Sequence, residues 1–374
     1  MDMVETVIEG NTRIVKVNLG ERSYSIYISA GSISRAGTII GEQFPGDRRC
    51  AVITSEPVNS LHGESLISGF EEAGLEADVI LVPDGEEAKS WNEAERVLGK
   101  LLDLGLDRRS IVVAFGGGSV GDLSGFISAI YLRGVDFVQV PTTLLAQVDS
   151  GIGGKAAVNH PKGKNLIGVF HQPSLVISDP ELLVTLPKEE LISGLAEVVK
   201  YGVVSDAELF SILESRAEEL IERDLTVLTE VIARCSAIKA GLVEVDELDT
   251  KGLRSALNYG HTVGHALETL TNFGLRHGEA VAMGMIVASR ISESQGLISK
   301  SDVQRQGKLL RRLGLRVLCP QLSAFELIEI MHRDKKTEGD SIKFVLPTGI
   351  GNPPAMRVVS DRLVTKALEQ CVHE

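Results

Sequence analysis

The chain has 374 residues, and its 38 basic and 51 acidic residues give a formal net charge of −13 at pH 7. Hydrophobic residues make up 43% and charged residues 24%, which is typical of a globular protein and excludes a predominantly disordered chain. The acidic balance argues against a protein that binds nucleic acid or an anionic membrane, because both need a cationic surface. An anionic small molecule would need a local cluster of Lys and Arg.

The four cysteines are widely spaced and form no CxxC pair, which predicts neither a disulfide framework nor a thiolate zinc site. The N-terminal segment is charged and has no apolar signal core. No apolar run approaches the length of about 18 residues that a membrane-spanning helix needs. We therefore expect a cytoplasmic protein that does not associate with membranes.

The first half of the chain alternates short apolar runs with amphipathic stretches. Alternation over residues 12–28 predicts an antiparallel hairpin or edge ribbon. Four apolar runs, at residues 50–54, 77–82, 110–115 and 136–140, predict strands, with helices after the first run and over 91–104. Near-continuous apolar strands separated by helices indicate a parallel sheet that is covered on both faces.

The pattern changes after about residue 179, where a helical period dominates, for example over 189–204 and 225–245. We therefore predict an α/β domain with a mostly parallel, Rossmann-like sheet over residues 1–180, followed by a mostly α-helical domain over 181–374. Ligands of open α/β sheets bind at the carboxyl ends of the strands. We expect a site in a cleft between the two domains.

A glycine-rich segment, Gly116–Gly121, satisfies the pattern G-x-G-x-x-G between a predicted strand and a predicted helix. Glycines there let the backbone approach a pyrophosphate, although a tight turn without a ligand fits the same pattern. The segment follows the third strand of the α/β pattern, whereas the usual dinucleotide motif follows the first. Asp122 would suit a ribose hydroxyl or a nicotinamide better than a phosphate. Residues 84–89 follow the second strand, and either grip a ribose phosphate or form a solvated helix start.

Residues 149–165 form a predicted glycine-rich loop with three lysines and two asparagines. Lysines interleaved with glycine favour an anion cradle, and the alternative is a flexible surface loop. Glu197 and Lys200 lie one turn apart in a predicted helix whose apolar neighbours suggest partial burial, where charges need partners or a metal. Taken alone, this pair also fits a surface ion pair.

Three of the eight histidines, His261, His265 and His277, lie within one short stretch. The first two are four residues apart and share a helical face. Because imidazole and carboxylate suit zinc or a similar metal, this group suggests a divalent metal site, although single histidines are often structural. The pattern does not decide whether His265 is a ligand or a proton carrier.

Together these segments closely resemble the 3-dehydroquinate synthase family of sugar-phosphate cyclases. The matching stretches follow the family's order, and they are Phe115–Asp122, Arg133–Lys155, Asn159–Gly168, Gly194–Gly202, Gly252–Glu268, His277–Gly284 and Asp334–Lys336. The resemblance implies an NAD-binding α/β domain, a helical domain that binds metal and substrate, and a homodimer. The implied cofactors are NAD and one divalent metal, zinc or cobalt.

The resemblance also implies roles for individual residues of this sequence. The implied metal ligands are Glu197, His261 and His277. The implied NAD contacts are Asp84, Gly85, Glu86, Glu87, Ala88, Lys89, Gly118, Ser119, Val120, Gly121, Asp122, Thr142, Thr143, Lys155, Lys164, Leu182, Leu183, Val184 and Thr185. The implied substrate and catalytic contacts are Arg133, Asp149, Lys155, Asn165, Lys200, Lys239, Arg254, Asn258, His265 and Lys336.

The family's reaction converts 3-deoxy-D-arabino-heptulosonate 7-phosphate to 3-dehydroquinate and phosphate, the second step of the shikimate pathway. NAD takes a hydride from a ring hydroxyl carbon, and a metal makes the bound hydroxyl more acidic, as it lowers the pKa of bound water from about 15.7 to about 7. Phosphate is then eliminated, the hydride returns, the ring opens, and an intramolecular aldol reaction closes the carbocycle. Our hypothesis is that His265 relays the hydroxyl proton.

Three alternatives remain at this point. Another sugar-phosphate cyclase, of the 2-deoxy-scyllo-inosose or epi-valiolone synthase type, would share the NAD and metal residues, although Asn258 and Lys336 match the dehydroquinate pattern. A metal-dependent polyol dehydrogenase of the glycerol dehydrogenase type would not need the full set of cations. A non-enzymatic NAD-sensing protein would not need the catalytic residues.

Overall fold

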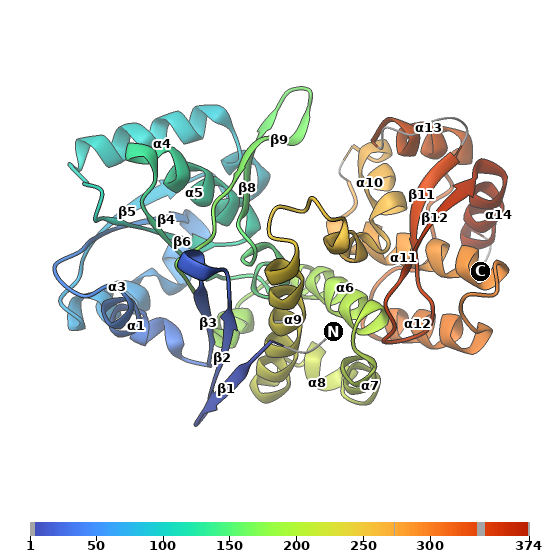
Figure 1. Ribbon diagram of the computed structural model, residues 1–374, viewed down its shortest axis with the longest axis horizontal. Coiled ribbons are helices and arrows are strands. Elements are labelled where there is room, and N and C mark those ends of the chain that lie inside the picture. Colours follow the sequence, from blue (N-terminus) through green and yellow to red (C-terminus); the bar gives the residue numbers. More distant parts are fainter. Residues whose placement is uncertain (1–3, 273, 335–340, 373–374) are drawn as a thin grey trace. The chain divides into compact units, whose positions relative to one another are not determined.

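The computed structural model describes residues 4–272, 274–334 and 341–372, which Figure 1 colours along the chain. The chain forms two compact units. The first comprises Met1–Pro187 and Leu228–Leu248, and the second comprises Lys188–Val227 and Asp249–Glu374. We had expected a single division at residue 180, whereas most of one long helix, α9 (Leu225–Val245), belongs to the first unit.

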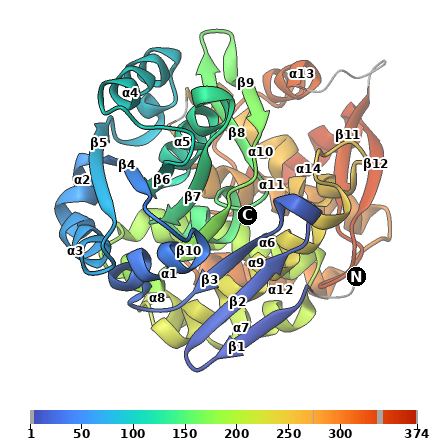
Figure 2. The same cartoon turned by 60° about the vertical axis from the view of Figure 1, so that its left-hand side comes forward.

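An eight-stranded sheet forms the centre of the first unit, in the order β1-β2-β3-β10-β7-β6-β4-β5. Its strands are β1 (Thr6–Glu9), β2 (Thr12–Val17), β3 (Tyr24–Ile28), β4 (Arg49–Ser55), β5 (Glu76–Val82), β6 (Ile111–Gly116), β7 (Asp136–Pro141) and β10 (Leu175–Ser178). The ribbon β1-β2-β3 is antiparallel, and all pairs from β3 to β5 are parallel. Figure 2 shows the ribbon at the end of this sheet. The predicted ribbon and the mostly parallel sheet are confirmed.

Helices cover both faces of this sheet. Successive side chains of each central strand point to opposite faces, and both sets are apolar, so each face needs a covering layer. On one face, α4 (Trp91–Asp103) and α5 (Gly118–Ile130) pack on residues such as Ile53 and Val112. On the other, α1 (Ala36–Gln43) and α3 (Glu64–Glu72) pack on residues such as Val52 and Val113. A short helix, α2 (Glu56–Val58), follows β4. The near-continuous apolar strands therefore arise from burial on both sides.

From Lys155 onward, the segment predicted as a glycine-rich loop belongs to an antiparallel hairpin, so that part of the prediction was wrong. Its strands are β8 (Lys155–His160) and β9 (Gly163–Phe170). Ala156 and Val158 of β8 are buried and join the core that α5 covers. Burial in β8 follows a two-residue period, but Ala157 between Ala156 and Val158 is also apolar, so the sequence does not show the alternation that would identify a strand. Strand β10 was also not predicted.

The second unit is mostly helical, as predicted. Its helices are α6 (Lys188–Val204), α7 (Ala207–Ser215), α8 (Ala217–Ile221), α10 (His261–Leu270), α11 (His277–Ser294), α12 (Lys300–Arg312), α13 (Ala324–Asp334) and α14 (Asp361–Val372). An antiparallel pair that we did not predict, β11 (Ser341–Leu346) and β12 (Ala355–Ser360), accompanies them. Helix α11 is buried along most of its length and forms the core of this unit.

Among the helices that the structure describes, none has the length and apolar composition that crossing a bilayer requires.

Candidate functional site

Most of the predicted nucleotide-binding residues lie at one edge of the sheet in the first unit. Residues 84–89 follow β5, Gly118–Asp122 form the first turn of α5 after β6, and Thr142 and Thr143 follow β7. The segment 182–185 follows β10, mostly within the 3₁₀ turn η7 (Pro180–Val184). Because these strands are parallel, their carboxyl ends meet at the same edge, which is where open α/β sheets bind ligands.

The glycine loop approaches its neighbours too closely for larger residues. A Cβ atom added to Gly118 would lie 2.8 Å from Ser150 Oγ, and one added to Gly121 would lie 2.9 Å from Gln139 Oε1. Gly117 occupies the N-cap of α5 and offers no side chain to the first-turn N–H groups, an arrangement that suits an anion. Close packing therefore accounts for glycine at positions 118 and 121.

Lys89 joins three of the predicted segments by internal contacts. Its side chain is buried, and its Nζ lies 2.5 Å from Asp122 Oδ2 and 2.5 Å from Asn165 Oδ1. Burial raises the pKa of Asp122, and the nearby Lys89 charge opposes that rise. Lys89 thus ties the turn after β5 to α5 and to the β8–β9 hairpin.

Replacing Lys89 with Met is expected to destabilise the first unit by about 3 kcal/mol, because the largely buried Asp122 carboxylate loses its cation. That change corresponds to a fall in melting temperature of about 6–12 °C, measurable by calorimetry. Lys100→Met, at an exposed position of α4, is the matched control. Equal melting temperatures for the two variants would contradict the structural role of Lys89.

Other predicted residues of the first unit are placed differently. Lys239, on α9, forms an ion pair with the Asp149 carboxylate, and its Nζ lies 2.6 Å from the Asp149 carbonyl oxygen. Lys164 Nζ lies 3.8 Å from Glu86 Oε1, and Lys155 begins β8. Arg133 follows α5 and precedes β7, so it lies at the amino ends of the strands, opposite the edge that holds residues 84–89 and Gly118–Asp122.

Three candidate metal ligands converge in the second unit from three different helices. Glu197 lies on α6, His261 begins α10, and His277 begins α11. Glu197 Oε1 is 3.5 Å from His261 Nε2 and 3.3 Å from His277 Nε2. The three ligand atoms all lie within 4.8 Å of one another. One carboxylate and two imidazoles in this arrangement form a donor set that suits zinc or a similar divalent ion.

Glycines next to the candidate ligands let these helices approach closely. A Cβ atom on Gly278 would lie 2.0 Å from the Ser193 carbonyl oxygen of α6, and one on Gly284 would lie 2.0 Å from the Gly260 carbonyl oxygen. The Gly278 N–H also donates to Ser193 Oγ at 3.0 Å. Gly278 follows His277, and Gly260 precedes His261, so these contacts set the positions of both histidines.

Burial and the two carboxylates shift the pKa values of the two histidines in opposite directions. Burial lowers the pKa of His261 to about 3, although the Glu197 charge opposes this. Burial would also lower the pKa of His277, but hydrogen bonds to Glu197 and Glu268, with their charges, raise it to about 10. Lys200 forms an ion pair with the Glu197 carboxylate deep within the unit.

The remaining predicted residues of the second unit that the structure describes lie within a few residues of His261 in the sequence. Arg254 is buried and Asn258 exposed within the 3₁₀ segment η8 (Leu253–Asn258), which ends shortly before α10. His265 is exposed, and its ring centroid is 5.3 Å from that of His261 and 6.3 Å from that of His277. Lys336 lies outside the described residues.

Comparison with known proteins also divides the chain into two parts, with the boundary between residues 193 and 194. Residues 79–193 match the 3-dehydroquinate synthase N-terminal family, and residues 194–337 match the 3-dehydroquinate synthase C-terminal family. The 3-dehydroquinate synthase of Pelobacter propionicus (strain DSM 2379 / NBRC 103807 / OttBd1) is 46% identical over 353 residues, which cover 94% of this chain and 98% of that protein. The chain belongs to the 3-dehydroquinate synthase family.

Two further relatives agree with this family assignment. The 3-dehydroquinate synthase of Desulforamulus reducens (strain ATCC BAA-1160 / DSM 100696 / MI-1) is 44% identical over 358 residues, covering 95% of this chain and 99% of that protein. A solved structure of a 2-epi-5-epi-valiolone synthase from Streptomyces hygroscopicus subsp. jinggangensis 5008, with NAD+ and Zn2+ bound, has a TM-score of 0.86 and 28% identity. It covers 95% of this chain and 98% of that one. The family resemblance seen in the sequence is confirmed.

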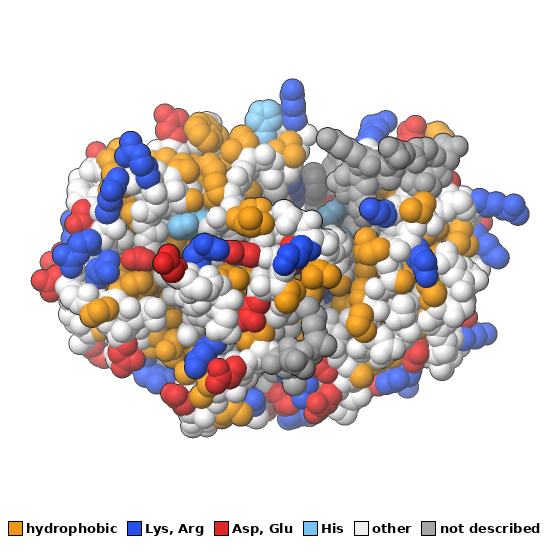
Figure 3. Space-filling model, viewed as in Figure 1, with side chains coloured by type: hydrophobic (Ala, Val, Ile, Leu, Met, Phe, Trp, Pro, Cys, Tyr) orange, Lys and Arg blue, Asp and Glu red, His pale blue; other side chains and the backbone are white. Residues whose placement is uncertain are grey.

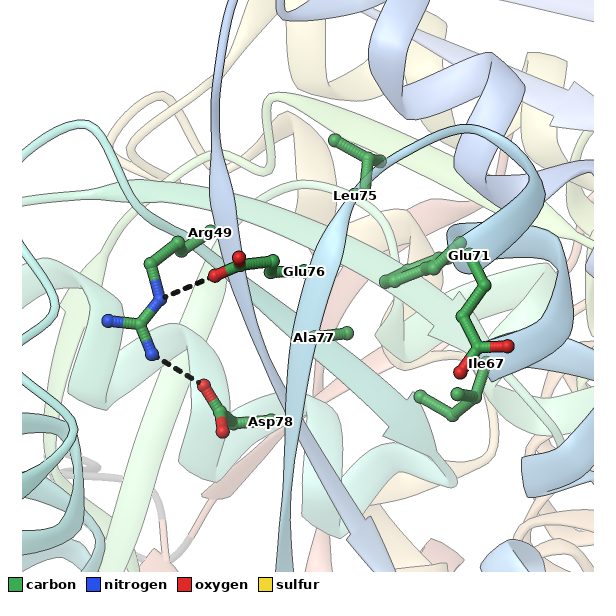
Figure 4. A pocket seen from close by; sticks show the side chains of 8 residues that line it. Arg49, Ile67, Glu71, Leu75, Glu76, Ala77 and Asp78 are labelled. Atoms are coloured by element: carbon green, nitrogen blue, oxygen red, sulfur yellow. Dashed lines mark hydrogen bonds and ion pairs between the residues drawn. The ribbon is translucent and has the colours of Figure 1, made fainter.

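A pocket of about 370 Å³ lies elsewhere on the first unit of this 3-dehydroquinate synthase family member (Figure 4). It is lined by α3 and by the starts of β4 and β5, at the amino ends of the strands. Its cation, Arg49, contacts Asp78 at 2.9 Å and Glu76 at 3.5 Å. The pocket therefore lies away from the family's predicted site residues, and its cation is already neutralised.

The sequence analysis did not single out Glu268, whose side chain contacts one of the three candidate metal ligands. Glu268 Oε1 lies 3.3 Å from His277 Nδ1. Glu268 lies seven residues after His261 on α10, so the two residues share a helical face, and that spacing was a usable signal.

Proposed function

We propose that this chain is a 3-dehydroquinate synthase that uses NAD and one divalent metal, zinc or cobalt. The observation that carries the proposal is the convergence of Glu197, His261 and His277 in a chain that belongs to this family. The substrate would be 3-deoxy-D-arabino-heptulosonate 7-phosphate, and the products 3-dehydroquinate and phosphate, which makes the enzyme a carbon–oxygen lyase acting on a phosphate.

The residues of the first unit suit NAD. The loop at Gly118–Asp122 presents backbone N–H groups to a pyrophosphate, and Thr142, Thr143 and the segments 84–89 and 182–185 share its edge of the sheet. Lys155 and Lys164 add cations from the hairpin that Lys89 anchors. When bound, NAD accepts and returns a hydride, and the metal makes a coordinated hydroxyl more acidic.

The chain's own residues would bind the substrate and move its protons. Lys200 and Arg254 are buried cations suited to the carboxylate and phosphate of the substrate. His265 is exposed one turn after His261 and is suited to carry the hydroxyl proton. Asn165, Asp149, Lys239, Asn258 and Lys336 are proposed as further substrate contacts, and Arg133 too, although it lies at the opposite edge of the sheet.

These local cations would have to attract an anion despite the negative net charge of the protein. On the face shown in Figure 3, acidic and basic side chains are interspersed among the described residues, without a continuous cationic surface. Anion binding must therefore come from specific residues and not from the overall field of a chain with net charge −13. This favours a small anionic substrate over a nucleic acid or an anionic membrane.

A turnover experiment distinguishes this proposal from its rivals. The protein is incubated with the heptulosonate phosphate, catalytic NAD and zinc, and phosphate release is followed. We expect many turnovers per NAD, because the hydride returns within each cycle. Stoichiometric accumulation of NADH would support a polyol dehydrogenase instead, and turnover only of sugar phosphates that lack the carboxylate would support another cyclase. No reaction with any sugar would support an NAD sensor.

The relatives favour the dehydroquinate reaction over that of another cyclase. The two curated 3-dehydroquinate synthases are 46% and 44% identical to this chain, against 28% for the valiolone synthase. We further propose a homodimer that works in the cytoplasm. The family resemblance supports the dimer, and four buried free cysteines fit a reducing compartment.

A further inference from the structure

His277 contacts a different carboxylate through each of its ring nitrogens. Its Nε2 is 3.3 Å from Glu197 Oε1, and its Nδ1 is 3.3 Å from Glu268 Oε1. An imidazole binds a metal through the nitrogen that has lost its proton, while the other nitrogen keeps a proton and donates it. Glu197 lies with the candidate ligands, so Glu268 is left as the acceptor for the remaining proton.

The second histidine shows the same division of roles. His261 Nδ1 lies 3.2 Å from the Tyr259 carbonyl oxygen, and its Nε2 faces Glu197. A backbone carbonyl can only accept a hydrogen bond, so it places the proton of a neutral His261 on Nδ1. Both rings thus turn Nε2 toward Glu197, but one uses a backbone oxygen and the other a carboxylate.

The different acceptors of the two Nδ1 protons correspond to a different exposure of the two rings. The His261 side chain is 14% exposed, whereas the His277 side chain is 31% exposed. Water competes more strongly for the Nδ1 proton of the more exposed ring, so a charged acceptor is needed to fix its orientation. Glu268 is itself only 13% exposed, which strengthens its hydrogen bond.

We propose that Glu268 is a positioning residue whose carboxylate holds the His277 proton on Nδ1 and leaves Nε2 free to bind the metal. The proposal rests on the function proposed above, because the ion is the one assigned there. Close packing of α10 on α11, where a Cβ atom on Gly264 would lie 3.2 Å from the Ala280 carbonyl oxygen, keeps Glu268 within reach of His277. Acceptors of this kind fix the tautomer of a ligand histidine and increase its basicity.

The experiment measures metal affinity and not turnover. Full-length protein is stripped of metal, and its zinc affinity is measured by competition with a chromophoric chelator. We expect Glu268→Ala to bind zinc about 10–100-fold more weakly than the wild type. Glu268→Gln is expected to lose less, because its amide oxygen still accepts from Nδ1. Glu326→Ala, at an exposed carboxylate of α13, is the control and is expected to match the wild type.

Two further readouts separate positioning from general damage. The melting temperatures of the metal-free proteins identify a variant that fails to fold, and nitrogen NMR of the zinc-loaded wild type is expected to show the His277 proton on Nδ1. If both Glu268 variants bound zinc as tightly as the wild type, or if the His277 proton were on Nε2, the positioning role of Glu268 would be wrong. The metal assignment would still stand. Failure of the wild type to bind zinc or cobalt would overturn the metal assignment itself, and this proposal with it.

Discussion

Replacing Glu197 with Gln is expected to weaken zinc binding by at least about 100-fold, because loss of a ligand should exceed the 10–100-fold effect of an outer partner. Gln keeps the volume of the side chain but has no negative charge. Its amide would face both His261 and His277, and Lys200 would lose its ion-pair partner. Turnover should fall with metal occupancy, so zinc affinity and phosphate release are measured on the same preparations.

Glu189→Gln is the matched control, because Glu189 lies at an exposed position on the same helix, α6. It is expected to keep the zinc affinity and the activity of the wild type. If Glu197→Gln also kept both, the trio would not be the metal site. A variant that lost activity but kept its zinc affinity would instead make Glu197 a substrate-binding residue.

The second large effect is expected from Gly278→Ala. The added Cβ atom would lie 2.0 Å from the Ser193 carbonyl oxygen and 2.6 Å from the Ser193 Cα. These are backbone atoms, which cannot rotate away, so the first turn of α11 must move off α6. Overpacking of this kind costs about 1–3 kcal/mol, or about 2–12 °C in melting temperature for a unit of this size. The shift also carries His277 away from Glu197, so zinc affinity is expected to fall together with stability.

Gly307→Ala tests whether this effect is specific to the packing site. Gly307 lies in α12 of the same unit, and the nearest atoms to an added Cβ are 3.6 Å away, at the end of the Arg311 side chain. An alanine there is expected to leave zinc affinity unchanged and to stabilise the helix by about 0.5–1 kcal/mol. Equal melting temperatures and zinc affinities for the two variants would contradict the proposed packing constraint.

The sequence predicted the elements whose signal is local. Burial on both faces makes β4 and β6 continuously apolar, and the long helices α6 and α9 show a helical period. The β8–β9 and β11–β12 hairpins were missed, because their stability depends on pairing partners and on packing that no short window contains.

The candidate site was predictable to a different degree in its different parts. The spacing of His261 and His265 indicated a metal site, and the apolar neighbours of Glu197 indicated a buried charge, but only the family resemblance joined Glu197, which lies on another helix, to the histidines. The contacts of Lys89 with Asp122 and Asn165 join residues far apart in the chain, so the sequence suggested ligand binding where the structure shows internal partners. Glu268 is a third case. Its spacing from His261 along α10 was visible in the sequence, but its contact with His277 Nδ1 is visible only in the structure.

The assignment of Leu228–Leu248 to the first unit has a consequence for biosynthesis. The ribosome makes Lys188–Val227, a part of the second unit, before it makes the segment that completes the first. A nascent chain that ends at Pro187 lacks Lys239, so the ion pair between Asp149 and Lys239 cannot yet form. Domains that are continuous in sequence can fold one after another as they emerge. Here the first unit is complete only after Leu248, so part of the second unit emerges before the first can finish folding.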